Sequence, residues 1–324
     1  MLYRRTALGA SIASLALPAL AQAPRRPLVL IVGAPPGGTA DAVCRVLAEA
    51  LRGELGGVVV VENRGGGSGL EAADRLVRAE PDGQTLLMAN TSVLAINPSL
   101  YPRLSYDPLR DFAFVGKVAT VPILLAVRRE LGVRNVAELI VLARSRPGAL
   151  NFGSAGTATA MHLAGVLFNQ MAGTEITHVP FRGSAPAVTN FIGGQGLDMM
   201  FEPAATLLEH IARGTIVPLA VADGERATAL PDVPTMSEAG LTGYLASQYF
   251  GLVAPAATPD ATVHRLSATM ARALATPAAI ERLRSIGAQP AASSPEELRR
   301  FVEEEIPRWR ELVRISGAQL DGGG

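Results

Sequence analysis

A strand-like run that ends in a proline- and glycine-rich turn and passes at once into a helix most restricts how this chain can fold. The run is Val29–Val32, the turn contains Pro35–Gly38, and the helix is predicted over Asp41–Leu51. This order places unpaired backbone N–H groups at a helix N-terminus, just beyond the carboxyl end of a parallel strand. Such a position binds anions without a charged side chain, and open α/β sheets usually hold their ligands there.

The same alternation continues along the chain and predicts an α/β fold of parallel sheets covered by helices. Strands are predicted at 29–32, 58–61, 85–88, 115–118, 123–127, 176–179, 197–201, 217–221 and 249–254. Helices are predicted at 41–51, 70–79, 136–145 and 159–171, with another that ends at 191 or 192. Residues 120–122 separate the strands at 115–118 and 123–127. A second strand–turn–helix unit begins at Leu150. The strand at 249–254 is expected to return to the first unit.

The C-terminal part reads as helical, with clear start signals. Thr258-Pro259 and Ser294-Pro295 each place a capping hydroxyl before a proline at the first helical position. Glu297 would complete a capping box with Ser294.

The first residues predict a removable leader. Arg4 and Arg5 precede an uncharged run, Thr6–Ala21, that is too short to span a bilayer comfortably. We expect a signal peptide over residues 1–21, cleavage after Ala21, and export to the periplasm by the general secretory or the twin-arginine route. A membrane anchor or a buried first helix is the alternative.

Charge and cysteine content narrow the functional classes. The 29 basic and 29 acidic residues cancel, so no net field attracts nucleic acid or a membrane surface. Cys44 is the only cysteine, which excludes a disulfide within the chain and a thiolate metal site, and it is expected to be buried. About 300 residues beyond the leader suggest two domains.

No pattern typical of an enzyme or a nucleotide site is complete. The four histidines, His162, His178, His210 and His264, lack the spacing of a helical metal site. Gly67–Ala72 matches a dinucleotide-binding pattern, but it follows the second strand rather than the first. We expect no cofactor and no metal, and no base beside a nucleophile.

Three turns that precede helices are rich in small and hydroxyl residues: Gly37–Thr39, Ser154–Thr157 and Gly183–Ala185. Glycine lets a ligand approach the backbone, and hydroxyls can donate to a carboxylate. Turns from two lobes facing each other would hold an anion between helix N-termini. The alternative for each turn is ordinary helix capping.

Taken in order, a set of short motifs resembles the substrate-binding proteins of tripartite tricarboxylate transporters, the periplasmic Bug family. The resemblance extends from about Arg26 to Asp321. The motifs are Pro35–Gly38 with Asp41, Val59–Arg64, Pro81–Gly83, Thr85–Met88, Ala95–Pro98, Tyr106–Pro108, Asn151–Gly156, His162–Gly165, His178–Pro186, Leu230–Thr235, Glu238–Gly240 and Phe250–Pro255.

This resemblance implies a type II periplasmic-binding-protein fold with two doubly wound α/β domains joined by crossing hinge strands. Domain 1 would comprise 22–122 and 249–324, and domain 2 would comprise 123–248. The implied function is capture of a small carboxylate in the interdomain cleft, by a monomer, for membrane permease subunits or a sensor. A periplasmic enzyme acting on a small carboxylate with the same fold is the alternative.

The family's binding residues map onto short segments of this chain, and water often bridges the ligand carboxylate to the first domain. The implied ligand-binding residues are Pro36, Gly37, Gly38, Thr39, Asp41, Thr91, Ser92, Ser154, Ala155, Gly156, Thr157, Phe181, Gly183, Ser184 and, less directly, Glu202.

Four departures from the family pattern carry expectations. Ala34 replaces a common Phe and would enlarge the pocket, and Tyr249 replaces a common Trp. Gly196 looks like an insertion that shifts the register of Glu202. Pro307 interrupts a helix that is continuous in relatives, so a kink or a restart is expected there.

Three of the mapped residues have alternative roles. Asp41 could serve only the first helix, and Phe181 could belong to the core. Glu202, if it faces the cleft, would repel a carboxylate and pair with an amino group.

Overall fold

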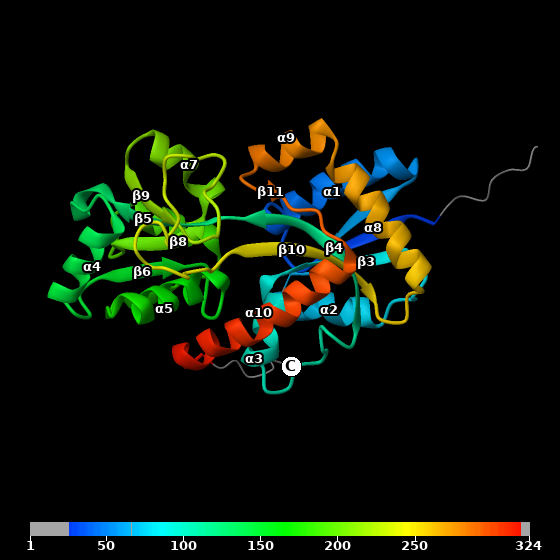
Figure 1. Cartoon of the computed structure of the whole chain (residues 1–324), viewed down its shortest axis with the longest axis horizontal. Helices are drawn as coiled ribbons and strands as arrows, with labels where there is room; N and C mark the ends of the chain where they lie inside the picture. Colours follow the sequence, from blue (N-terminus) through cyan, green and yellow to red (C-terminus); the bar gives the residue numbers. More distant parts are fainter. Residues whose placement is uncertain (1–25, 66, 319–324) are drawn as a thin grey trace, which may run out of the picture.

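Two β-sheets, each covered by helices, form two lobes that lie side by side (Figure 1). The computed structural model describes residues 26–65 and 67–318. The predicted leader, residues 1–21, lies outside these residues. The two sheets and their covering helices confirm the predicted α/β class.

The first sheet has the strand order β11–β4–β10–β3–β1–β2. β1 pairs in parallel with β2 and β3, so the carboxyl ends of all three lie at one edge. β10 runs antiparallel to β3 and β4, which confirms that the strand predicted at 249–254 returns to the first unit. The strands are β1 (Leu28–Val32), β2 (Val59–Asn63), β3 (Thr85–Asn90), β4 (Phe112–Val121), β10 (Gln248–Pro255) and β11 (Gln289–Pro290).

The second sheet has the order β7–β6–β8–β5–β9. β6 pairs in parallel with β7 and β8, whereas β5 runs antiparallel to β8 and β9. Both sheets are therefore mixed, and the expectation of wholly parallel sheets is wrong for the crossing strands. The strands are β5 (Ile123–Arg128), β6 (Asn151–Ser154), β7 (Thr177–Pro180), β8 (Met199–Pro203) and β9 (Ile216–Val221).

The predicted helices are confirmed, with shifts at their ends. None of the described helices is long and apolar enough to cross a bilayer. The helices are α1 (Thr39–Leu55), α2 (Leu70–Val77), α3 (Asn97–Leu100), α4 (Val136–Ser145), α5 (Ala160–Ala172), α6 (Ser184–Ile192), α7 (Ala204–Ala212), α8 (Asp260–Leu274), α9 (Pro277–Ser285) and α10 (Pro295–Ser316), with short helical turns η1 (Gly67–Gly69), η2 (Ser92–Ile96) and η3 (Arg129–Leu131).

Alternate side chains of β1 enter two different cores, as the strand period of two requires. Leu30 and Val32 pack with apolar residues of α1 and α8. Ile31 belongs to another cluster, which contains residues of α2 and α10 and extends to α4 and α5 of the second lobe. The face that α10 covers is thus joined to the second lobe by continuous apolar packing.

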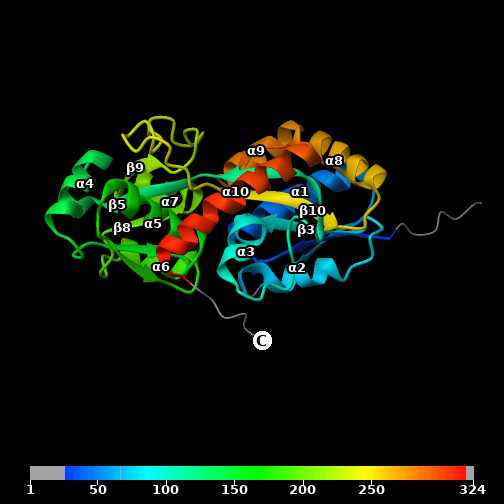
Figure 2. The ribbon, with the colours of Figure 1, turned by 60° about the horizontal axis from the view of Figure 1, so that its bottom comes forward.

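The lobes are joined by β10 and by the passage from β4 to β5 (Figure 1). Only Pro122 separates those two strands, so the predicted break at residues 120–122 shrinks to one residue. Pairing of β4 with β10 and β11 keeps Thr120 in the sheet. α10 also lies across both lobes and contacts α5 (Figure 2).

The helix-start predictions had mixed outcomes. Ser294 and Glu297 form the predicted capping box. Thr258 does not cap α8, because Pro259 is itself the extended N-cap residue, with ψ 137°, and the helix begins at Asp260. The helix does not restart at Pro307, because α10 continues through that residue with Ile306 and Trp309 buried beside it; the kink that was the other possibility stays a prediction.

Candidate ligand-binding site

A buried carboxylate holds the turn between β1 and α1. Asp41 is 3 % exposed. It accepts hydrogen bonds from the Gly37 N–H at 2.9 Å, Asn63 Nδ2 at 2.8 Å and Arg45 Nε at 2.9 Å. Burial raises the pKa of Asp41, but these hydrogen bonds outweigh it and leave the pKa below its ordinary value. The Asp41 carboxylate and the Gly37 N–H therefore already have hydrogen-bond partners within the turn.

The first turn of α1 itself has no side-chain cap. Its N-cap, Gly38, is extended, with φ −81° and ψ 171°, and offers no side chain to the helix. Pro36 and Gly38 are exposed and Thr39 is half-buried. The N–H groups that open α1 therefore lie at an accessible corner, beyond the carboxyl end of β1.

Thr91 and Ser92 follow β3, whose carboxyl end lies beside that of β1. The Thr91 hydroxyl is buried and accepts a hydrogen bond from the Tyr249 N–H at 2.9 Å, which ties the end of β3 to β10. Ser92 is half-buried at the start of η2. Tyr249 is fully buried and packs edge-on against Phe301 of α10, with ring centroids 4.8 Å apart.

Two turns of the second lobe are joined by backbone hydrogen bonds. The Phe181 N–H donates to the Ser154 carbonyl at 3.1 Å, and the Gly183 N–H donates to the Ala155 carbonyl at 3.0 Å. Gly156 has φ +145°, and Thr157 is exposed at the tip of its turn. The predicted residues 154–157 and 181–184 therefore form one continuous corner of the lobe.

α6 begins at this corner without a side-chain cap. Its N-cap is Gly183, with φ +106°, and Ser184 is its first residue. Glu202, at the carboxyl end of β8, is fully buried. Burial raises its pKa to about 7, although the nearby Ser184 hydroxyl lowers it slightly. Phe181 is half-buried and packs against the apolar cluster beneath α6.

Ser154 and His178 form a pair that the sequence did not indicate. Ser154 Oγ lies 2.7 Å from His178 Nε2, and the His178 ring stacks on His162 with centroids 3.9 Å apart. Burial lowers the pKa of His162 to about 4 and, with His162 adjacent, that of His178 to about 3. The expectation that no base lies beside a nucleophile is therefore wrong. Ser154 is fully buried, however, and its hydroxyl also accepts from the Gly156 N–H at 3.2 Å, so the pair orders the turn.

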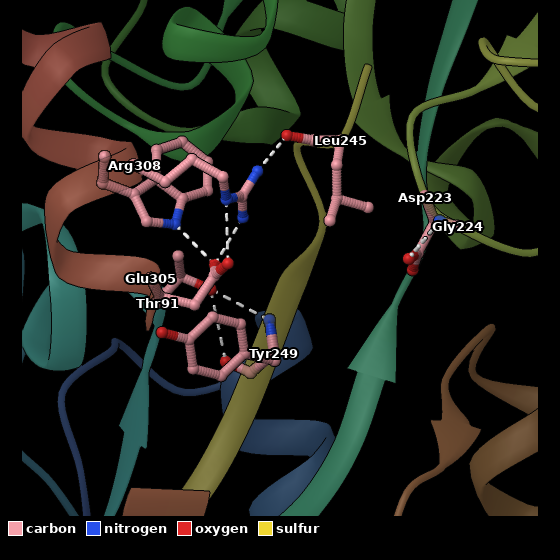
Figure 3. A network of polar contacts seen from close by, with 8 residues as sticks. Thr91, Asp223, Gly224, Leu245, Tyr249, Glu305 and Arg308 are labelled. Carbon is pink, nitrogen blue, oxygen red and sulfur yellow. Dashed lines mark hydrogen bonds and ion pairs between the residues drawn. The ribbon is translucent and has the colours of Figure 1, made fainter. Parts of the chain in front are cut away.

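A second unforeseen polar network lies where α10 meets the crossing strand β10 (Figure 3). Glu305 accepts hydrogen bonds from Trp309 Nε1 at 2.8 Å and from Arg308. Arg308 also donates to the Leu245 carbonyl, just before β10. The network connects α10 to the segment that leaves the second lobe.

The predicted site residues thus form two clusters, one at the edge of each sheet. Residues 36–41 and 91–92 lie in the first lobe, and residues 154–157, 181–184 and 202 lie in the second. That the clusters face one another across a cleft stays a prediction. Among the described residues, no three His, Cys, Asp or Glu are grouped to hold a metal, and Cys44 is buried.

The lobes do meet close to Pro122. A cavity of about 210 Å³ lies there, lined by small residues of both lobes, including Ala204, Ala227 and Gly287. Gln289 Nε2 of the first lobe donates to the Arg226 carbonyl at 3.2 Å. These contacts lie beside the crossing strands.

Comparisons with known proteins agree with this architecture. Residues 43–317 match the family described as tripartite tricarboxylate transporter family receptor. Protein BugT of Bordetella pertussis is 37% identical over 299 residues, which cover 92% of this chain and 91% of BugT. The structure of R. palustris Rpa4515 with adipate has a TM-score of 0.82 and 36% identity, and covers 92% of this chain and 99% of that one. MatC (Rpa3494) from Rhodopseudomonas palustris with bound malate has a TM-score of 0.76 and 32% identity, over 89% and 99% of the two chains.

Proposed function

Because the chain belongs to the tripartite tricarboxylate transporter receptor family, we propose that it is a periplasmic receptor that captures a small carboxylate between its two lobes. Two similar structures hold adipate and malate, which are both carboxylates. In this proposal residues 22–122 and 249–324 form one lobe and residues 123–248 the other, after removal of the leader. The loaded receptor would deliver its ligand to membrane permease subunits or report it to a sensor.

The observation that carries the proposal is that both predicted corners contain the start of a helix without a side-chain cap. α1 and α6 begin at Gly38 and Gly183, which offer no capping side chain. Asn135, Thr159 and Ser294 cap α4, α5 and α10 with their own oxygens, whereas α2, α7 and α8 also lack a side-chain cap. The position of α1 and α6 at the predicted corners is therefore what distinguishes them. Uncapped N–H groups at a helix N-terminus favour an anion as their partner.

In this proposal the two clusters contribute different groups to carboxylate binding. In the first lobe, Asp41 holds the Gly37 N–H and Asn63 and so fixes the turn that precedes the N–H groups after Gly38. In the second lobe, Ser154 and His178 fix the corner from which Thr157 and Ser184 offer hydroxyl donors. Backbone amides supply most of the selectivity, so no arginine clamp is required.

Gly38 offers a direct test. Its φ of −81° suits any residue, and a Cβ there would lie 3.8 Å from its nearest neighbour. Gly38→Asp would place a carboxylate on the N–H groups proposed to hold the ligand. Like-charge repulsion at about 5 Å should then weaken carboxylate binding roughly 100-fold, while fold stability changes by only a few tenths of a kcal/mol.

The control is Gly38→Ala, which adds a methyl group without a competing acceptor and should retain binding within about threefold. Isothermal titration with a panel of carboxylates, chosen after mass spectrometry of co-purifying molecules, provides the readout. Equal affinities for the two variants would refute the role assigned to α1. Product formation on prolonged incubation would favour an enzyme over a receptor.

A further inference from the structure

Glu202 is a buried acid that the amide-based capture described above does not use. It lies at the carboxyl end of β8, opposite Leu124 of β5. The side chain is fully buried, and neither carboxyl oxygen has a hydrogen-bond partner. The Ser184 hydroxyl, on the first residue of α6, lies close enough to influence its pKa. The acid therefore sits beside the uncapped N-terminus of α6.

The elements packed around Glu202 provide no counter-charge. β5 from Ile123 to Val127, β6 and all of α6 lack ionisable residues, and α5, which also contacts β8, carries only His162, whose pKa burial lowers to about 4. α7 carries Glu209 and His210 only in its second half, and Arg182 is exposed in the turn before α6. An ionised carboxylate buried without a partner costs several kcal/mol. The protonated form is therefore favoured until the pH exceeds the raised pKa of about 7.

We propose that carboxylate binding at the N-terminus of α6 is linked to protonation of Glu202, so that the receptor takes up a proton together with its ligand. This inference rests on the proposed function, because it concerns the same site. A ligand carboxylate at the start of α6 would add a second negative charge beside the buried Glu202, and repulsion between the two charges favours the protonated form of Glu202. The positive end of the α6 dipole then serves the ligand alone.

The other groups with shifted pKa values lie away from Glu202 or remain neutral in the pH range tested; His264, whose pKa its hydrogen bonds raise, is exposed on α8 of the first lobe. His162 and His178, with pKa values of about 4 and 3, remain neutral above pH 6. Small carboxylates ionise near pH 4. Two half-buried groups also have shifted pKa values: Asp223, whose pKa burial raises, and Lys117, whose pKa burial lowers. Both lie by the crossing strands, outside the corner that holds Glu202.

The experiment is calorimetric titration of the full mature chain with adipate and with malate between pH 6.5 and 8.5. Running it in phosphate and in Tris, which differ in ionisation enthalpy, measures proton uptake directly. The wild type should take up most of one proton at pH 8, and its affinity should fall about tenfold for each pH unit above 7. This measurement needs no variant.

Glu202→Gln removes the titration and keeps the shape. It should bind with the same affinity across the range, without linked proton uptake, and at least about tenfold more tightly than the wild type at pH 8.5. Glu209→Gln, on the exposed part of α7, is the matched control and should keep the slope of the wild type.

Three outcomes would overturn the linkage. Binding by the wild type with neither proton uptake nor a pH slope would show that Glu202 is independent of the ligand. Affinity that rises with pH would show that ionised Glu202 pairs with a cationic group on the ligand. Failure of every carboxylate to bind at any pH would refute the proposed function and this linkage with it.

Discussion

His162, which is buried, and His178, which is half-buried, form a neutral aromatic stack behind the turn that ends β6. The unfolded chain binds protons on these rings near pH 6.5, whereas the folded chain resists protonation down to about pH 4 and about pH 3. The unfolded state therefore binds more protons below pH 6.5, and stability falls as the pH decreases through this window.

We expect His178→Gln to lessen this loss. On going from pH 7 to pH 4, the wild type should lose roughly 3 kcal/mol more unfolding free energy than the variant. Urea unfolding at several pH values gives the measurement. His264→Gln is the control: His264 is exposed and its pKa is raised, so its small effect has the opposite sign. Parallel pH profiles for wild type and His178→Gln would contradict the prediction.

For single residues, turn conformation was predictable from the sequence, whereas contacts between residues far apart in the sequence were not. The turn at Gly37–Gly38 was predictable from local composition, since glycine and proline act within a few residues of themselves. The partners of Asp41 and Ser154 were not predictable. Asn63 reaches Asp41 because β2 lies beside β1. His178 reaches Ser154 because the register of β6 and β7 places it opposite Phe152.

At the scale of elements, one feature of α10 was predictable from the sequence and another was not. Its start was predictable because a capping box is a local signal. Its continuity through Pro307 was not, since the helix is held by apolar packing of Val302, Ile306 and Trp309 against other elements. The end of β4 was unpredictable for the same reason: the strand extends to Val121 because it pairs with β10 and β11.

Glu305 should be the most sensitive polar position of α10. It is 4 % exposed and accepts hydrogen bonds from Trp309 and Arg308. Glu305→Ala leaves the buried indole N–H without an acceptor and removes the carboxylate that pairs with the half-buried guanidinium, which keeps only the Leu245 carbonyl. The substitution should lower the free energy of unfolding by about 3 kcal/mol. Guanidinium unfolding measures the change. Glu303 forms an exposed ion pair with Arg299 on the same helix. Glu303→Ala should therefore lower the free energy of unfolding by less than about 0.5 kcal/mol. Equal losses for the two would refute the buried network.

At the scale of the whole molecule, the alternation of strands and helices predicted the α/β class and the return of the strand at 249–254. The division of the chain near residue 122 was implied only by the family resemblance and stays a prediction; the structure shows that Pro122 alone separates β4 from β5. The mixed direction of the strands was not predictable, because it depends on how the crossing strands enter each sheet. Nor could the pattern reveal that α10 spans both lobes.

The apolar cluster shared by α10, α2 and the helices of the second lobe couples the melting of the two halves. Neither lobe can lose its tertiary structure without exposing side chains buried against the other. Differential scanning calorimetry of the ligand-free protein should therefore give one endotherm, with a van't Hoff enthalpy equal to the calorimetric enthalpy. Two resolved peaks would show that each half melts by itself. A receptor of this design would denature as one body, although its two sheets form separate lobes.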